Sequence, residues 1–196
     1  MRLGRNGEPS LIIGFDVRVF SRLADGNQAE RMVSFDPTVW ASLRELAPQE
    51  ALKIYEMSLM SDRSNGLNLF VDPPSLPTPE DYIVVAFDAP QDTVEYMCNS
   101  FGLQPALGRN SDELLRQGFS FLGYDVVDLW TQSSVLIGAG DLISNRVVRN
   151  RFGLIDKKDE AIVAAEGVDN MDIGRAPFQA IGIWIQARKQ PGTDHE

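Results

Sequence analysis

Three segments carry the apolar pattern of β-strands. Residues 11–20 (LIIGFDVRVF) alternate between apolar and charged positions and are rich in β-branched side chains, which predicts a strand. Residues 82–87 (YIVVAF) form an almost continuous apolar run, which predicts a strand inside the sheet that is covered on both faces. Residues 178–186 (FQAIGIWIQ) alternate again and predict a third strand. Shorter strands are expected near residues 32–35 and 66–71.

Apolar residues recur at helical spacing in five other segments. The expected helices begin at residues that favour a helix start, either a capping side chain or a proline, and the third ends at a glycine. In chain order they are a helix from Asp36-Pro37 to Ala47, one from Pro48 to about Asp62, one from Asp88-Ala89-Pro90 to Gly102, a short one from Ser111, and one over residues 156–166.

Residues 119–137 fit two patterns. The beginning fits a strand, whereas the apolar positions further on recur at helical spacing. We expect a strand to about Tyr124 and a helix from Asp125. On that helix Asp125 and Asp128, three residues apart, would share one face. A tight turn is expected at Gly138-Ala139-Gly140, which lacks the remaining residues of a phosphate-binding loop.

The order of these elements predicts an α+β fold with a mostly antiparallel sheet. Strands and helices alternate without a regular βαβ rhythm, and no internal repeat is visible. We expect one domain over residues 11–187, with flexible ends at residues 1–10 and 188–196. The proline-rich stretch Pro73–Pro79 is interpreted as a surface loop of this domain; a linker or a ligand for a proline-binding module remain the alternatives.

The composition is that of an ordinary globular protein. Hydrophobic residues make up 43% of the 196 residues, and Cys98 is the only cysteine, so a disulfide scaffold is excluded. The apolar stretch near the beginning stops at Asp16, which is too short for a signal peptide or a membrane span. A cytoplasmic location without membrane association is therefore expected.

The net charge of −10 changes the range of expected partners. It arises from 18 basic and 28 acidic residues. Nucleic acid is a poor partner, because affinity for phosphates comes mainly from lysine and arginine. A basic protein is the kind of partner that such a charge favours. The alternative is that the charge only keeps the protein soluble.

Two groups of carboxylates are candidates for binding a basic partner. One group brackets the start of the third predicted helix, and the other gathers around the last predicted helix. Either group could also be plain solvated surface. The predicted partner-binding residues are Asp88, Asp92, Glu95, Asp156, Asp159, Glu160, Asp169 and Asp172.

Catalytic side chains are scarce, and no cofactor-binding or metal-binding residue is predicted. His195 is the only histidine and lies in the expected C-terminal tail, whereas Cys98 is expected to be a small buried residue. Asp125 and Asp128 could act as an acid–base pair, or simply as capping or surface charges. Three arginines, Arg146, Arg149 and Arg151, could bind an anion or pair with the chain's own carboxylates.

Two stretches resemble bacterial toxin-immunity proteins. Residues 121–130 (FLGYDVVDLW) are similar to a segment of this class, and residues 176–184 (APFQAIGIW) are similar to its closing strand. The resemblance implies a small cytoplasmic protein without catalytic activity that binds and neutralises one cognate toxin domain, often a nuclease. Aromatic residues would anchor such binding, but Trp40, Trp130 and Trp184 are equally suited to a core.

Two other functions remain open at this point. The first is a carboxylate-dependent hydrolase that uses Asp125 and Asp128. The second is an unrelated acidic interaction or scaffold protein. The scarcity of histidine and cysteine argues against the hydrolase, and only the resemblance separates the immunity protein from the scaffold.

Overall fold

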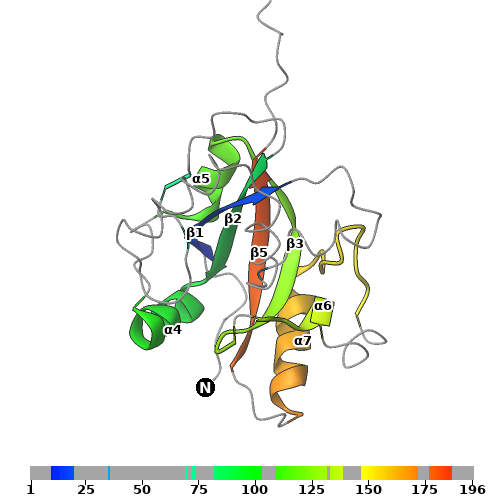
Figure 1. The fold of residues 1–196 in the computed structure, drawn as a ribbon. Coiled ribbons are helices and arrows are strands. Elements are labelled where there is room, and N and C mark those ends of the chain that lie inside the picture. Colours follow the sequence, from blue (N-terminus) through cyan, green and yellow to red (C-terminus); the bar gives the residue numbers. More distant parts are fainter. Residues whose placement is uncertain are drawn as a thin grey trace, which may run out of the picture.

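The computed structural model describes nine parts of the chain: residues 10–19, 35, 69, 72–73, 82–102, 109–131, 133–138, 147–171 and 177–186. They form an α+β fold built on a single five-stranded sheet (Figure 1). The strands pair antiparallel throughout, so the predicted fold class is confirmed.

The sheet places the last strand of the chain between two earlier ones. Its order is β1-β2-β5-β3-β4. β2 and β3 therefore reach each other only through β5, which pairs with both. The strands are β1 (Ser10–Val19), β2 (Tyr82–Pro90), β3 (Phe119–Asp128), β4 (Ser133–Ser134) and β5 (Phe178–Gln186).

Four helices are described, and they agree in part with the sequence. The helices are α4 (Gln91–Phe101), α5 (Ser111–Arg116), α6 (Val135–Gly138) and α7 (Lys158–Asp169). The predicted end of α4 at Gly102 is confirmed, because this glycine takes the left-handed conformation with φ 64°. The predicted start is wrong: Asp88 still belongs to β2, where it pairs with Gly182.

The predicted division of residues 119–137 is also wrong. β3 continues as a strand to Asp128, since it pairs with β5 along its whole length, from Phe119 opposite Gln186 to Asp128 opposite Phe178. The pairing with β5 overrides the helical spacing of the apolar positions. As a consequence, Asp125 and Asp128 point to opposite faces of the sheet and not to one face of a helix.

Both faces of the sheet are buried. On one face α4 packs Val94 and Met97 against a cluster that includes Val85, Phe87 and Ile183. On the other face α7 covers β3 and β5, and α5 packs against β1 and β3, with Leu114 in a cluster that includes Phe15 and Phe119. The predicted burial of β2 on both sides is confirmed. Val85 and Phe87 lie in the cluster under α4, whereas Val84 and Ala86 lie in the cluster on the opposite face.

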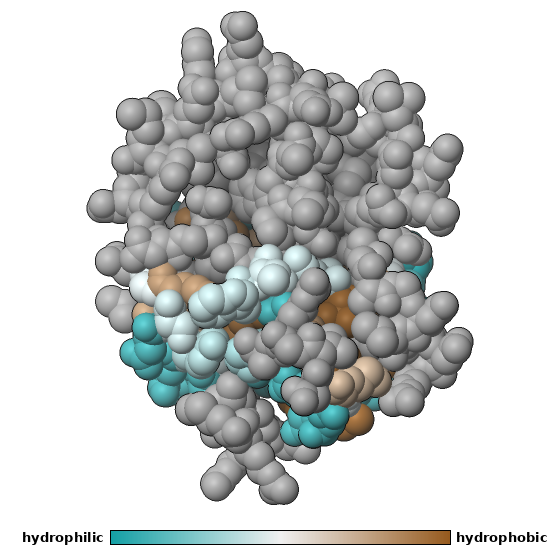
Figure 2. Space-filling view, turned by 60° about the horizontal axis from the view of Figure 1, so that its bottom comes forward, coloured by the Kyte–Doolittle hydropathy of each residue, from teal (hydrophilic) through white to brown (hydrophobic). Residues whose placement is uncertain are grey.

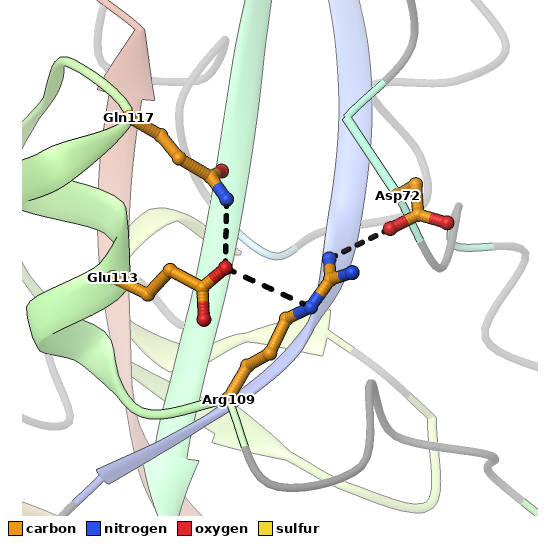
Figure 3. A network of polar contacts seen from close by, with 4 residues as sticks. All are labelled: Asp72, Arg109, Glu113 and Gln117. Atoms are coloured by element: carbon orange, nitrogen blue, oxygen red, sulfur yellow. Dashed lines mark hydrogen bonds and ion pairs between the residues drawn. The ribbon is translucent and has the colours of Figure 1, made fainter.

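A network of polar side chains fastens α5 to neighbouring parts of the chain (Figure 3). Arg109 Nη1 lies 2.7 Å from Asp72 Oδ1, and Arg109 Nε lies 3.8 Å from Glu113 Oε1. Gln117 Nε2 donates to the same glutamate oxygen at 3.0 Å. The carbonyl of Arg109 also accepts from Ile12 N at 3.1 Å, so the segment that leads into α5 is tied to β1.

A bulge in β3 depends on Gly123. The register with β5 shifts between Phe121 and Gly123, and Gly123 has φ 143°. A Cβ atom at this position would lie 2.8 Å from Leu154 Cβ, which is closer than real Cβ atoms come. The missing side chain lets the segment after residue 150 pair with Tyr124, through Tyr124 N to Ile155 O at 2.7 Å and the reverse bond at 2.9 Å.

Several predictions from the sequence fall outside the described residues. They are the short strand before Phe35, the helices at 36–47 and 48–62, the strand at 66–71 apart from Leu69, most of the Pro73–Pro79 loop, Ala139-Gly140, both expected flexible ends apart from Ser10, and Trp40, Arg146, Asp172 and His195.

We expect Gly123→Ala to lower the free energy of unfolding by about 2 kcal/mol or more, because the new Cβ meets Leu154 and the backbone conformation disfavours it. Gly167→Ala is the matched control. Gly167 lies in α7 with nothing within 4 Å of a new Cβ, so alanine there should stabilise by up to about 1 kcal/mol. Urea unfolding of both variants measures this; equal stability of the two would contradict the described bulge.

Candidate functional site

The predicted partner-binding carboxylates separate into surface and interior positions. Five of them are exposed: Glu95, Asp156, Asp159, Glu160 and Asp169. Asp92 is half-buried on α4. Asp88 is only 3% exposed, so its prediction as a surface contact is wrong. The reason is its place in the buried strand β2, where it pairs with Gly182 of β5.

The outward face of α7 is acidic around an apolar centre. Its inner face is formed by small residues that pack on β3 and β5, namely Ala161, Ala164, Ala165 and Val168. The residues between them point outward: Asp159, Glu160 and Glu166 are exposed, and Val163 among them is 66% exposed. We call this set the α7 face. Lys158, at the first turn, is the only basic residue within the helix.

Some acidic side chains around α7 have local partners. Lys157 Nζ lies 2.6 Å from Glu160 Oε1, Asn150 Nδ2 donates to Asp156 Oδ1 at 2.7 Å, and Asp169 Oδ1 accepts from Phe178 N at 3.0 Å. Asp159 and Glu166 make no hydrogen bond or ion pair with another described residue. These two carboxylates are therefore the ones that the fold leaves for solvent or a partner.

Asp125 is a hydrogen-bonded carboxylate of the core. It is fully buried in the middle of β3. Its Oδ2 accepts from Phe35 N at 2.9 Å, and its Oδ1 accepts from the Ser134 hydroxyl at 2.6 Å. The side chain thus joins β3 to β4 and to a residue ninety positions earlier. A buried carboxylate with two good donors is a structural element that is costly to remove.

Asp128 builds the turn that follows β3. It is 1% exposed, and its Oδ1 accepts from Trp130 N at 2.9 Å and from Thr131 N at 3.3 Å. Its Oδ2 accepts from the Thr131 hydroxyl at 2.8 Å. Since Asp125 and Asp128 lie on opposite faces and each has its own donors, the predicted acid–base pair does not form.

The turn held by Asp128 presents a tryptophan to solvent. Trp130 is 71% exposed, whereas Trp184 is 8% exposed. The Trp130 ring packs at 6.4 Å against Phe101, which in turn lies 6.1 Å from Tyr96 on α4. We call Tyr96, Phe101 and Trp130 the aromatic row. From the sequence, Trp130 is equally suited to an interface or to the core. The sequence feature that indicates its exposed position is the aspartate two residues before it, whose side chain holds an Asx turn.

The aromatic row lies at one end of the sheet together with acidic residues. Thr93 in the first turn of α4 is joined to Gln179 near the start of β5 by a hydrogen bond of 2.8 Å. Leu129 N donates to Pro177 O at 3.1 Å. The next residue, Phe178, donates its N–H to Asp169. Figure 2 looks onto this end, which is lowest in Figure 1, and shows hydrophilic and hydrophobic residues side by side.

Asp88 is a buried acid whose pKa departs strongly from its usual value. Its carboxyl fills the space above Gly182, where a Cβ would overlap Asp88 Oδ1. Burial raises the pKa of Asp88 from 3.8 to about 6, while the nearby Trp184 indole, Lys158 and the Ser111 hydroxyl oppose the rise. The indole is close but not well aligned, since Asp88 Oδ1 and Trp184 Nε1 are both buried without a hydrogen-bond partner.

Aromatic rings enclose this carboxyl. Phe121 lies 4.9 Å from both Tyr124 and Trp184, measured between ring centroids, and about two-thirds of Phe121 is covered. Burial, and then the charges of Asp88 and Asp159, raise the pKa of Tyr124 to about 12. Asp88 is therefore an interior carboxyl, 3% exposed, and not a surface contact for a partner.

The remaining candidates have ordinary surroundings. Arg149 donates to the carbonyl of Leu136 at 2.6 Å, and Arg151 lies over the ring of Phe152 at 4.7 Å from its centroid. Neither forms an ion pair with a described carboxylate. Cys98 is half-buried beside the α4 cluster, and burial raises the pKa of its thiol.

The described residues hold no metal site, and no compared protein matches the chain. Within the described ranges, no three histidine, cysteine, aspartate or glutamate residues come together as metal ligands. No helix in these ranges is long and apolar enough to cross a membrane. No family model matches the chain, and neither a curated protein nor a solved structure matches it.

The raised pKa of Asp88 makes stability depend on pH. Because the folded-state pKa of about 6 lies above the usual 3.8, protonated Asp88 favours the fold below about pH 4, and this contribution is lost as the pH rises through 6. As the pH rises from 4 to 7, we expect the free energy of unfolding of Asp88→Asn to increase by roughly 3 kcal/mol relative to that of the wild type.

Urea unfolding of both proteins over this pH range measures the difference. The control is Glu166→Gln on the exposed surface of α7, which also removes one carboxylate but leaves the buried Asp88 in place. Wild-type and Asp88→Asn curves that stay parallel from pH 4 to pH 7 would contradict the assignment.

Proposed function

We propose that the protein is an immunity protein that binds a basic bacterial toxin domain and blocks it by occlusion. The observation that carries the proposal is the α7 face, which turns Asp159, Glu160 and Glu166 outward around Val163. The resemblance of residues 121–130 and 176–184 to immunity proteins points in the same direction.

The charges on the α7 face suit a positively charged cleft. A domain that cuts nucleic acid has to attract phosphates, and it does so with lysine and arginine. Carboxylates at the surface of an inhibitor meet the same basic groups, while the net charge of −10 attracts the two proteins over a longer range. Val163 supplies apolar area in the middle of this charge, as the centres of protein interfaces commonly do.

The positions of Asp125 and Asp128 favour a binding function over a hydrolase in which these two residues act as an acid–base pair. Asp125 and Asp128 are held by backbone and hydroxyl donors on opposite faces of β3. A hydrolase that uses them together has no geometric support. An unrelated acidic interaction protein differs from an immunity protein in its partner, and the following experiment separates the two.

The direct test is neutralisation of a toxin. The first observation is the reading frame immediately upstream of this chain's gene, which we expect to encode a large secreted protein with a toxic C-terminal domain; that domain is the probe. We expect that co-expression of the full chain restores growth and that the two proteins co-purify. Co-expression of the chain with Gly123→Ala, whose fold should be weakened, is the control and should protect less well. Unrelieved toxicity with a well-folded wild-type chain would rule the proposal out.

The α7 face makes a separate kinetic prediction. We expect the association rate with that toxin domain to fall steeply between low salt and about 0.15 M salt, because screening shortens the reach of the charges. The double variant Asp159→Asn, Glu166→Gln should associate about two- to fivefold more slowly at low salt, with a nearly unchanged dissociation rate. Surface plasmon resonance measures both rates. An association rate that ignores both salt and the double substitution would leave the α7 face without a role.

A further inference from the structure

Trp130 stands out among the exposed residues of the described chain. It is 71% exposed, although tryptophan is usually largely covered in a folded protein. Tryptophan is also the residue type most enriched among those that dominate binding energy at protein interfaces. An exposed tryptophan with no obvious role inside the fold is therefore a candidate anchor for a partner.

The turn that carries Trp130 is fixed by buried groups. Asp128, 1% exposed, accepts hydrogen bonds from Trp130 N and from both the backbone and the hydroxyl of Thr131. On the other side of the turn, Leu129 is 1% exposed and donates its N–H to Pro177 O at 3.1 Å. The backbone on both sides of the tryptophan is thus held before any partner arrives, which lowers the entropy lost on binding.

The ring is positioned as well as the backbone. One side of Trp130 packs against Phe101, which contacts Tyr96 on α4. Asp92 lies one helical turn before Tyr96, and Glu95 is exposed next to it. Glu95 accepts a hydrogen bond from the Gln91 side chain and forms no ion pair with a described residue. The aromatic row therefore joins Trp130 to an acidic stretch of α4.

We propose that Trp130 is the anchor of the toxin-binding surface, and that it receives a cationic side chain of the toxin domain beside the carboxylates of Asp92 and Glu95. This inference rests on the proposed function. A guanidinium group stacks on the face of a tryptophan and pairs with carboxylates, so the aromatic row and the acidic end of α4 fit the same arginine-rich surface.

A cationic partner fits this surface better than a second copy of the chain. The first turn of α4 contributes Asp92, and its last turn contains no basic residue that could attract the carboxylates of another copy. The chain as a whole carries a charge of −10, so two copies repel each other. An oppositely charged protein meets no such repulsion.

The test compares Trp130→Ala with a matched exposed apolar residue. Val148 is 83% exposed on a different segment, so Val148→Ala is the control. The probe is the toxin domain used for neutralisation, and its Kd and dissociation rate are measured for wild type, Trp130→Ala, Trp130→Phe and Val148→Ala. Urea midpoints of all four proteins verify that they are equally folded, as expected for substitutions at exposed side chains.

We expect Trp130→Ala to raise Kd at least about 30-fold, mainly through faster dissociation. Trp130→Phe should bind between wild type and alanine, and Val148→Ala should stay within about twofold of wild type. Wild-type binding with an unchanged Trp130→Ala variant overturns the inference and leaves the proposed function standing. A folded wild-type chain that does not bind overturns both. Self-association of the wild-type chain that Trp130→Ala abolishes, with the Kd for the toxin domain unchanged, overturns the inference alone.

Discussion

The pairing of β3 with β5 is the constraint on which the rest of the described structure depends. β5 (Phe178–Gln186) comes last in the chain but lies between β2 and β3, so the sheet cannot be complete before it is in place. The pairing extends β3 to Asp128 and sets Gly182 opposite Asp88 on the other side. A residue directly before β5, Pro177, also holds the turn that presents Trp130.

This pairing divides the carboxylates into two classes with different roles. Those on the strands are enclosed: Asp125 and Asp128 bind donors of neighbouring segments, and Asp88 lies over Gly182 with a raised pKa. Those on the helices point outward, because small apolar residues of α7 occupy the side that faces the sheet. Asp125 and Asp128 thus organise the fold through their donors, and Asp159 and Glu166 are the exposed acids without a partner among the described residues.

The sequence predicted what local patterns decide. The three long alternating or apolar runs became strands, and Gly102 ended α4 because a glycine accepts the left-handed conformation. The predictions were wrong where contacts with segments distant in the sequence determine the local structure. Pairing with β5 kept residues 125–128 extended, and the same sheet enclosed Asp88. The exposure of Trp130 depends on a turn at the end of that longer strand, so it could not be expected from a predicted helix.

The proposed binding surface combines Trp130, the neighbouring acidic end of α4 and the α7 face. Amide hydrogen exchange of the chain, free and in complex with the toxin domain, measures directly which of these segments the partner covers. We expect slower exchange on binding at residues 91–101, 129–131 and 158–169, with little change along β1. Protection confined to other segments, with exchange at all three of these unaltered, would contradict the proposed surface.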